Sequence, residues 1–163
     1  VGELARQYYG GGINIDSLDY TEAEDMTRDL MKKDHVIMYE PAFRYENLFI
    51  RIDILVKEGL TLRLIEVKSK SYDSNGSKPF LTSSGHISSV WKPYLHDVAF
   101  QHYVLEKSCP GYTVHSYLMM ADNNAPCPTS GLNQKFRIIK DSTNRKGVRV
   151  SSTLSASAQP LPV

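Results

Sequence analysis

The chain has 163 residues, a length that predicts one domain with room for a sizeable hydrophobic core. Hydrophobic residues make up 41% and charged residues 23%, which is ordinary for a soluble globular protein, and the net charge of +1 excludes a generally basic nucleic-acid binder. No run approaches about 18 apolar residues, so we expect no membrane partner and an intracellular, cytoplasmic location. The start lacks a signal-peptide pattern and an initiator Met, which suggests other domains in a longer chain.

The first part of the chain predicts two helices and a strand. Residues 3–9 are expected to form a short helix that ends at three consecutive glycines. A longer helix is expected over 21–33, because Thr21 followed three residues later by Glu24 is a capping box and the apolar residues that follow recur near helical spacing. Residues 36–40 are expected to form a strand that ends before the next proline.

A β-hairpin is expected next. Residues 47–56 and 61–69 are rich in Leu, Ile and Val, and the turn between them is placed near Glu58-Gly59. The stretch 73–90 is rich in Ser and Gly and predicts a long inserted loop, mobile and near the entrance of any site on the hairpin.

The rest of the chain predicts a helix over 95–107 and a strand over 112–120, followed by a loop-rich region. Residues 136–139 form either a last short strand or the start of a helix, and from Ser151 the chain turns to Ser, Ala and Pro, which suggests a mobile tail. The order helix, three strands, helix, strand indicates a mixed α/β or α+β fold, with a central mixed sheet flanked by helices. We therefore expect a single domain over 1–150 and a tail beyond it.

The predicted hairpin carries acids within its apolar strands. Strand side chains alternate between faces, so Glu66 and Lys68 share a face. In the expected register position 57 pairs with 60 and position 53 with 64, which makes Asp53 and Glu66 diagonal neighbours roughly 7–8 Å apart at the backbone. Two carboxylates that close repel each other unless something positive lies between them. A divalent cation satisfies both, and with Lys68 one pleat along the arrangement suits metal-assisted hydrolysis of a phosphodiester.

A salt-bridged sheet face is the simpler alternative, because an acid, a second acid and a lysine at this spacing arise readily by chance. The context of the three residues strengthens the case for a site. They interrupt runs of Leu, Ile and Val, and ionisable groups are rarely buried unless they are paired or bound to metal.

Taken in order, these residues resemble the PD-(D/E)XK nuclease superfamily over roughly residues 1–140. The likeness is to the branch that contains the nuclease domain of the RecB helicase-nuclease and the related CRISPR-associated nucleases, and to a bacterial domain-of-unknown-function family within the superfamily. It rests on Glu40 at a strand end, on Asp53-Ile54-Leu55, on Glu66-Val67-Lys68, and on Gln101 with Tyr103 in the following helix. The fold that it implies is the restriction-endonuclease-like core.

Three departures from the family pattern are visible. Tyr103 follows Gln101 by two positions, whereas the branch often has Gln-x-x-x-Tyr. Many members carry four cysteines for an iron–sulfur cluster, whereas this chain has only Cys109 and Cys127, which we expect to be isolated thiols. The stretch 73–90 looks like an insertion that leaves the core intact.

The resemblance implies a metal-dependent nuclease that acts on DNA, with RNA as the less favoured substrate. Asp53 and Glu66 would hold Mg²⁺ or Mn²⁺, and the carbonyl of Val67 would add a ligand. The ion would lower the pKa of a bound water and neutralise charge on the phosphate. Lys68 would orient that water or stabilise the developing charge. Glu40 would be either an extra metal ligand or a structural acid at the strand end.

Several residues near the predicted site keep two interpretations. Gln101 would orient the lysine, the water or a nucleic-acid backbone group, or it satisfies a nearby backbone group. Asp97 would support the site or, as we favour, lie in the first turn of its helix, where an acid suits the helix dipole. Trp91 and Tyr94 would stack on a base or, as we favour, pack in the core and anchor the loop. The alternative function is a catalytically inactive nucleic-acid-binding or structural module with the same fold.

Overall fold

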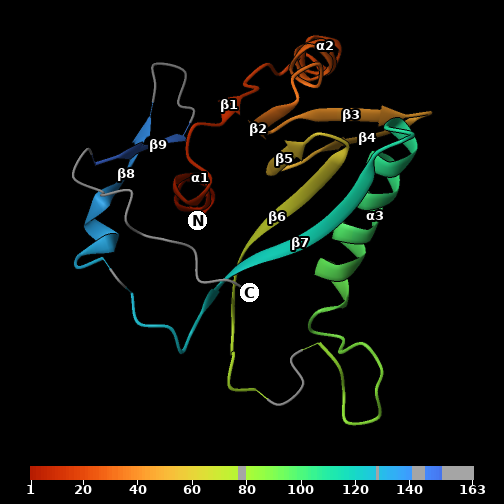
Figure 1. Cartoon of the computed structure of the whole chain (residues 1–163). Helices are drawn as coiled ribbons and strands as arrows, with labels where there is room; N and C mark the ends of the chain where they lie inside the picture. Colours follow the sequence, from red (N-terminus) through yellow and green to blue (C-terminus); the bar gives the residue numbers. More distant parts are fainter. Residues whose placement is uncertain (77–79, 128, 141–145, 152–163) are drawn as a thin grey trace.

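The computed structural model describes residues 1–76, 80–127, 129–140 and 146–151. The chain forms a mixed α/β fold with a central five-stranded sheet flanked by helices (Figure 1), which confirms the predicted fold class. In chain order the elements are α1 (Gly2–Tyr8), β1 (Ile13–Asn14), α2 (Tyr20–Leu30), β2 (His35–Tyr39), β3 (Ala42–Tyr45), β4 (Leu48–Arg51), β5 (Ile54–Glu58), β6 (Thr61–Tyr72), α3 (Lys92–Ser108), β7 (Thr113–Asp122), the 3₁₀ helix η1 (Leu132–Lys135), β8 (Phe136–Lys140) and β9 (Lys146–Val150).

The central sheet has the strand order β1-β2-β5-β6-β7. Strand β5 is antiparallel to both of its neighbours, β2 and β6, whereas β7 pairs parallel with β6. Parallel neighbours cannot be joined by a tight turn, and α3 provides the crossover connection between them. The segment from α2 to β7 therefore has the predicted order of helix, three strands, helix and strand, with the β3–β4 hairpin inserted after the first strand.

The turn of the β5–β6 hairpin lies one residue later than predicted. The loop is Gly59-Leu60, and Gly59 takes a positive φ of 55°, which glycine adopts at little cost. Glu58 therefore pairs with Thr61, and the predicted pairs of 57 with 60 and 53 with 64 are wrong. The register differs by two residues, so every side chain keeps its predicted face, because faces alternate with a period of two.

The observed register changes the expected position of Asp53 relative to Glu66. Ile54 pairs with Ile65, and Asp53 is the residue just before this pair. Asp53 therefore lies level with Glu66, and not diagonal to it as the predicted register has it.

The predicted strand over 47–56 is two strands in different sheets. Strand β4 pairs with β3, which the sequence does not predict, and β5 joins the central sheet. The chain crosses between the sheets at Ile52 and Asp53, where Ile52 N–H donates to Pro41 O at 3.1 Å and Glu40 N–H donates to Asp53 O at 3.3 Å. The sequence gives no signal for this break, because neither a glycine nor a proline interrupts the largely apolar stretch that contains it.

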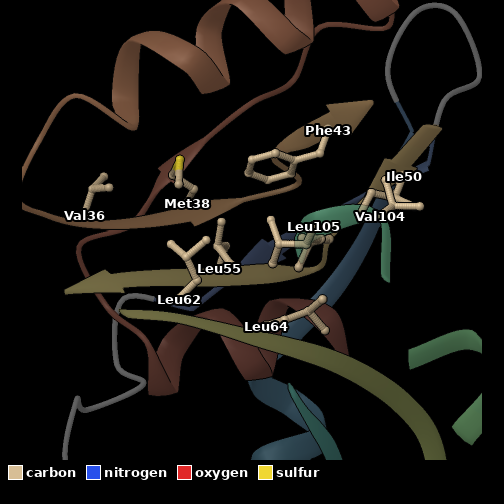
Figure 2. Packing of buried hydrophobic residues seen from close by; sticks show 10 residues of the cluster. Val36, Met38, Phe43, Ile50, Leu55, Leu62, Leu64, Val104 and Leu105 are labelled. Carbon is tan, nitrogen blue, oxygen red and sulfur yellow. The ribbon is translucent and has the colours of Figure 1, made fainter. Parts of the chain in front are cut away.

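The sheet is covered on both faces. One face packs against α3 and the β3–β4 hairpin through the buried cluster of Figure 2, which consists of Val36, Met38, Phe43, Ile50, Ile52, Leu55, Leu62, Leu64, Val104 and Leu105. The opposite face packs against α1 through the buried residues Ala5, Tyr39, Ile54, Val56 and Ile65. Strands covered on both faces carry nearly continuous apolar runs, so an acid within them is largely removed from water.

Both long helices begin earlier than the sequence predicts. The N-cap of α2 is Asp19, whose side chain accepts the Glu22 N–H at 2.9 Å, so the capping box predicted for Thr21 and Glu24 is wrong. The acid at position 19 is itself a strong capping residue, and it takes this role two positions before Thr21. Helix α3 begins at residue 92 and not at 95, with a proline in its first turn, where a missing N–H is tolerated.

The predicted inserted loop over 73–90 is fixed at its end by aromatic contacts. The ring of Phe80 stacks on Tyr72 with centroids 5.9 Å apart and meets Trp91 edge-on at 5.2 Å. Trp91 is only 9% exposed, so it packs inside and anchors the loop, the role that the sequence favours. Residues 77–79 of this loop lie outside the described residues.

The C-terminal region adds a small separate hairpin. Of the two alternatives left open for 136–139, the structure has the strand, β8, and its antiparallel partner β9 is not predicted from the sequence. The mobile tail predicted from Ser151 lies outside the described residues except for Ser151 itself. The assignment of a single domain to 1–150 stays a prediction.

Replacing Trp91 by Ala should lower the free energy of unfolding by roughly 3 kcal/mol, because the change empties a buried aromatic site beneath the loop. Replacing the loop tip, residues 82–86, by Asn-Gly should change it by less than about 1 kcal/mol, since the tip lies between the two residues of the isolated bridge Leu81–Ile87 and is mostly exposed. Urea titrations measure both changes. A shortened tip that destabilises more than Trp91→Ala would show that the tip itself holds the loop.

Candidate active site

Asp53 lies at the point where the chain enters the central sheet. Its Oδ2 accepts the N–H of Val67 at 2.7 Å, which ties the start of β5 to β6 and holds the carboxylate beside Glu66. Asp53 forms no ion pair with any described residue. Val67 thus contributes its backbone N–H to the site. The role of metal ligand predicted for its carbonyl stays a prediction.

Glu66 is the centre of the hydrogen-bonded network. It lies in β6 and is 7% exposed. Its Oε1 accepts a hydrogen bond from Lys68 Nζ at 2.6 Å, and its Oε2 accepts one from Gln101 Nε2 at 2.8 Å. The structure therefore joins Glu66, Lys68 and Gln101 directly and places Asp53 next to them, so the four side chains predicted as catalytic lie together.

Asp97 belongs to the same network, and the role favoured from the sequence is wrong. Because α3 begins at Lys92, Asp97 lies beyond the first turn, and its Oδ2 accepts a hydrogen bond from Lys68 Nζ at 2.5 Å. Gln101 Nε2 also approaches Asp97 Oδ1 at 3.4 Å. The available signal was the spacing of four between Asp97 and Gln101, which puts both on one helical face. The assignment failed because the helix start was placed three residues late.

The two ends of the Gln101 amide have different environments. The residue is 6% exposed, and its nitrogen donates to Glu66 and, at a longer distance, to Asp97. Its Oε1 is buried and has no hydrogen-bond partner among the described residues. An unpaired buried acceptor costs on the order of 1–3 kcal/mol. Gln101 therefore presents an unused acceptor to any donor that enters the site, such as a water.

Asp53, which is partly buried, and Glu66, which is buried, are both harder to ionise than a free carboxyl group. Burial raises the pKa of Asp53, and the neighbouring charge of Glu40 raises it further. Burial also raises the pKa of Glu66, against the opposing hydrogen bonds from Lys68 and Gln101, and the charge of Asp53 adds to the increase. The largest cause in both cases is the loss of hydration on burial, which the hydrogen bonds and the nearby cationic side chains do not offset. A cation placed between them would favour the ionised form of both.

Lys68 and Asp97 favour their charged forms. Burial alone would lower the pKa of Lys68, but hydrogen bonds and charges from Asp97 and Glu66 outweigh burial and raise that pKa above its ordinary value. Burial would raise the pKa of Asp97, but the hydrogen bonds from Lys68 and Gln101 lower it below its ordinary value. Lys68 is therefore firmly protonated, which suits it to stabilise negative charge and not to act as a base.

Glu40 lies near Asp53 but is engaged in an ion pair. It follows β2 with a positive φ of 57°, which is uncommon for a residue other than glycine. Its Oε1 is 3.1 Å from Arg6 Nη2, and Arg6 also pairs with Glu3 and lies over the ring of Tyr39. This ion pair favours the structural-acid alternative for Glu40, and its role as a metal ligand stays a prediction.

The donor set fits a divalent cation held by two carboxylates. Asp53 and Glu66 supply the hard oxygens that Mg²⁺ and Mn²⁺ prefer, and the orphaned Oε1 of Gln101 lies on the side chain that contacts Glu66. Within the described ranges, no three Asp, Glu, His or Cys side chains come together in a group that could hold a metal ion, so Glu40 as a third ligand has no support from the structure and stays a prediction. Two carboxylates suffice for Mg²⁺, which usually keeps several waters.

Tyr103 and the two cysteines lie apart from this network. The Tyr103 ring is exposed, meets Tyr45 edge-on with centroids 6.1 Å apart and has the Lys107 ammonium 5.9 Å from its centroid. Cys109 and Cys127 are both free thiols, as the sequence predicts.

Three comparisons with known proteins find no match: a scan against family models, a search of curated proteins and a search of solved structures. The likeness to the PD-(D/E)XK superfamily therefore rests on the residues quoted for it. In the part of the chain that the structure describes, no helix is both long and apolar enough to cross a membrane.

Asp53→Asn should leave the free energy of unfolding of the metal-free protein unchanged at pH 7 or raise it by up to about 1 kcal/mol. Asparagine keeps an oxygen for the Val67 N–H and removes a charge that burial disfavours. Because the pKa of Asp53 is raised on folding, the folded state binds this proton more tightly, and ionised Asp53 costs stability above its folded-state pKa. The gain should therefore shrink as the pH falls through that pKa toward the unfolded value of about 3.9.

Thermal melts in chelator between pH 7 and pH 4 measure this gain. Asp25→Asn is the matched control, because Asp25 lies on the exposed side of α2, and it should show no comparable gain at pH 7. If Asp53→Asn melts far below the parent at pH 7, the ionised carboxylate stabilises the fold through its contacts. That result would contradict the claim that its charge destabilises the metal-free protein.

Proposed function

We propose that this chain is a divalent-metal-dependent nuclease that hydrolyses phosphodiester bonds in DNA. One observation carries the proposal: the partly buried carboxylate of Asp53 lies beside the buried carboxylate of Glu66, and Glu66 holds the ammonium of Lys68. Stability alone gives little reason to keep such a group in an apolar sheet, because replacing buried charges by apolar residues is often neutral or stabilising. Perturbed acids of this kind concentrate at functional sites.

The family that we propose is the PD-(D/E)XK superfamily, in its RecB-like branch. Glu66 and Lys68 lie on β6 of a mixed sheet, Asp53 comes just before the adjacent strand β5, and the helix that follows contributes Gln101 to them. The order of α2, β2, β5, β6, α3 and β7 also agrees with the helix, three strands, helix and strand from which the fold class was predicted. Because one fold can serve many functions, the proposal depends on the site more than on this topology.

The residues of the site divide the work of hydrolysis. Asp53 and Glu66 would hold Mg²⁺ or Mn²⁺, which supplies Lewis-acid activation of water and neutralises charge at the phosphate. Lys68 keeps a fixed positive charge where negative charge develops on the phosphate oxygens during attack. Gln101 offers Oε1 to a hydrogen of the attacking water and so orients the water oxygen toward phosphorus.

Glu66→Gln and Lys68→Met should each lower the cleavage rate about 100-fold or more, because each removes a charge that acts at the phosphate. The parent protein should cleave DNA with Mn²⁺ or Mg²⁺ and lose this activity in chelator. The assay uses single-stranded, double-stranded and branched DNA, with RNA of the same sequences alongside.

Glu58→Gln and Lys32→Met are the matched controls, since both side chains are exposed members of surface ion pairs, and both variants should keep the parent rate. Cleavage that is unchanged in Glu66→Gln and in Lys68→Met would exclude this site. A parent that binds DNA and Mn²⁺ but cleaves no substrate would favour the inactive binding module with the same fold.

A further inference from the structure

The Lys68 ammonium is shared by two carboxylates of different origin. Glu66 lies two residues before it on the same strand, whereas Asp97 reaches it from α3, 29 residues away in the chain. The side chain of Asp97 is 41% exposed and that of Glu66 is 9% exposed. The ammonium therefore lies between an inner acid that belongs to the proposed metal site and an outer acid that does not.

Cation binding would weaken the contact of Lys68 with Glu66 and leave its contact with Asp97 in place. Glu66 attracts the ammonium at present, but a divalent ion shared by Glu66 and Asp53 would neutralise the two carboxylates and remove that attraction. A lysine has a flexible four-carbon stem, so an ammonium that Glu66 no longer attracted would move into solvent unless another group held it. Asp97 is the only other acid that forms an ion pair with Lys68 among the described residues.

We propose that Asp97 is the positioning residue of this site: it holds the ammonium of Lys68 next to Glu66 when a divalent cation occupies Glu66. This inference rests on the proposed function. Asp97 does the same for Gln101, whose amide nitrogen lies 3.4 Å from Asp97 Oδ1 and 2.8 Å from Glu66 Oε2. The Asp97 carboxylate thus positions both donors to Glu66, the neutral amide of Gln101 and the charged ammonium of Lys68, without binding the cation itself.

The geometry separates Asp97 from the cation ligands. Its two oxygens face Lys68 and Gln101, which are both hydrogen-bond donors, so its lone pairs are directed at those groups. The lysine ammonium stands between Asp97 and Glu66, and a cation that bound both acids would have to displace it. Asp97→Asn should therefore impair chemistry while it leaves cation affinity nearly intact.

The test compares Asp97→Asn with the parent by three measurements. Calorimetry with Mn²⁺ should give a dissociation constant within about threefold of the parent value. The rate constant kcat with saturating Mn²⁺ and DNA should fall about 10- to 100-fold with little change in KM, the range typical of residues that orient a reacting group. In ¹⁵N-labelled protein with Mg²⁺, the ammonium signal of Lys68 should be visible in the parent and lost in the variant, because an unanchored ammonium exchanges its protons with water.

Two further variants separate positioning from a general structural effect. Asp97→Glu keeps the charge on a longer stem and should restore part of the lost kcat and the Lys68 signal. Asp29→Asn breaks the exposed Asp29–Lys32 ion pair of the same residue types and should leave both readouts unchanged. Thermal melts confirm that all variants are folded under the assay conditions.

Each contrary result has a distinct meaning. A loss of Mn²⁺ affinity in Asp97→Asn as large as that in Asp53→Asn would make Asp97 a metal ligand and overturn the positioning role. An unchanged kcat, or a Lys68 ammonium signal that persists in Asp97→Asn, would overturn it as well. A parent that neither binds Mn²⁺ nor cleaves DNA would overturn the proposed function, and the role of Asp97 with it.

Discussion

The structure depends on how the fold accommodates two carboxylates within an apolar sheet. Strands β5 and β6 are covered on both faces, so Asp53 and Glu66 lose much of their hydration. Hydrogen-bond donors compensate each acid: the Val67 N–H for Asp53, and for Glu66 both Lys68 on the same strand and Gln101 on α3. This compensation is incomplete, because burial still raises the pKa of both acids. This incomplete compensation is the physical basis on which we propose a cation at this site.

Helix α3 couples the packing of the core to the geometry of the site. Val104 and Leu105 are buried in the core on one face of the sheet, and Gln101 and Asp97 continue the same side of the helix at spacings of three and four residues. The apolar half of α3 therefore sets the position of its polar half. The crossover from β6 through α3 to β7 requires this packing, so the parallel strand pair and the polar network depend on the same contacts.

The sequence predicts which side chains come together better than it predicts their exact geometry. Because strand faces alternate, the shared face of Glu66 and Lys68 was predictable, and it survived an error of two residues in the hairpin register. That register depends on the backbone conformation of Gly59, which sequence patterns do not determine. The role of Asp97 depended on the exact start of a helix, where such predictions are least reliable. The ion pair of Glu40 with Arg6 joins residues 34 apart and leaves no local signal.

The most direct test of the central claim is a crystal structure of the protein grown with Mn²⁺, with anomalous diffraction measured at the manganese absorption edge. We expect one anomalous peak about 2.0–2.2 Å from a carboxylate oxygen of Asp53 and from one of Glu66, with the remaining positions filled by water. Lys68 should remain in contact with Asp97 in that structure. The account is contradicted if crystals at millimolar Mn²⁺ show no peak between these two acids, or if Lys68 alone occupies the space between them.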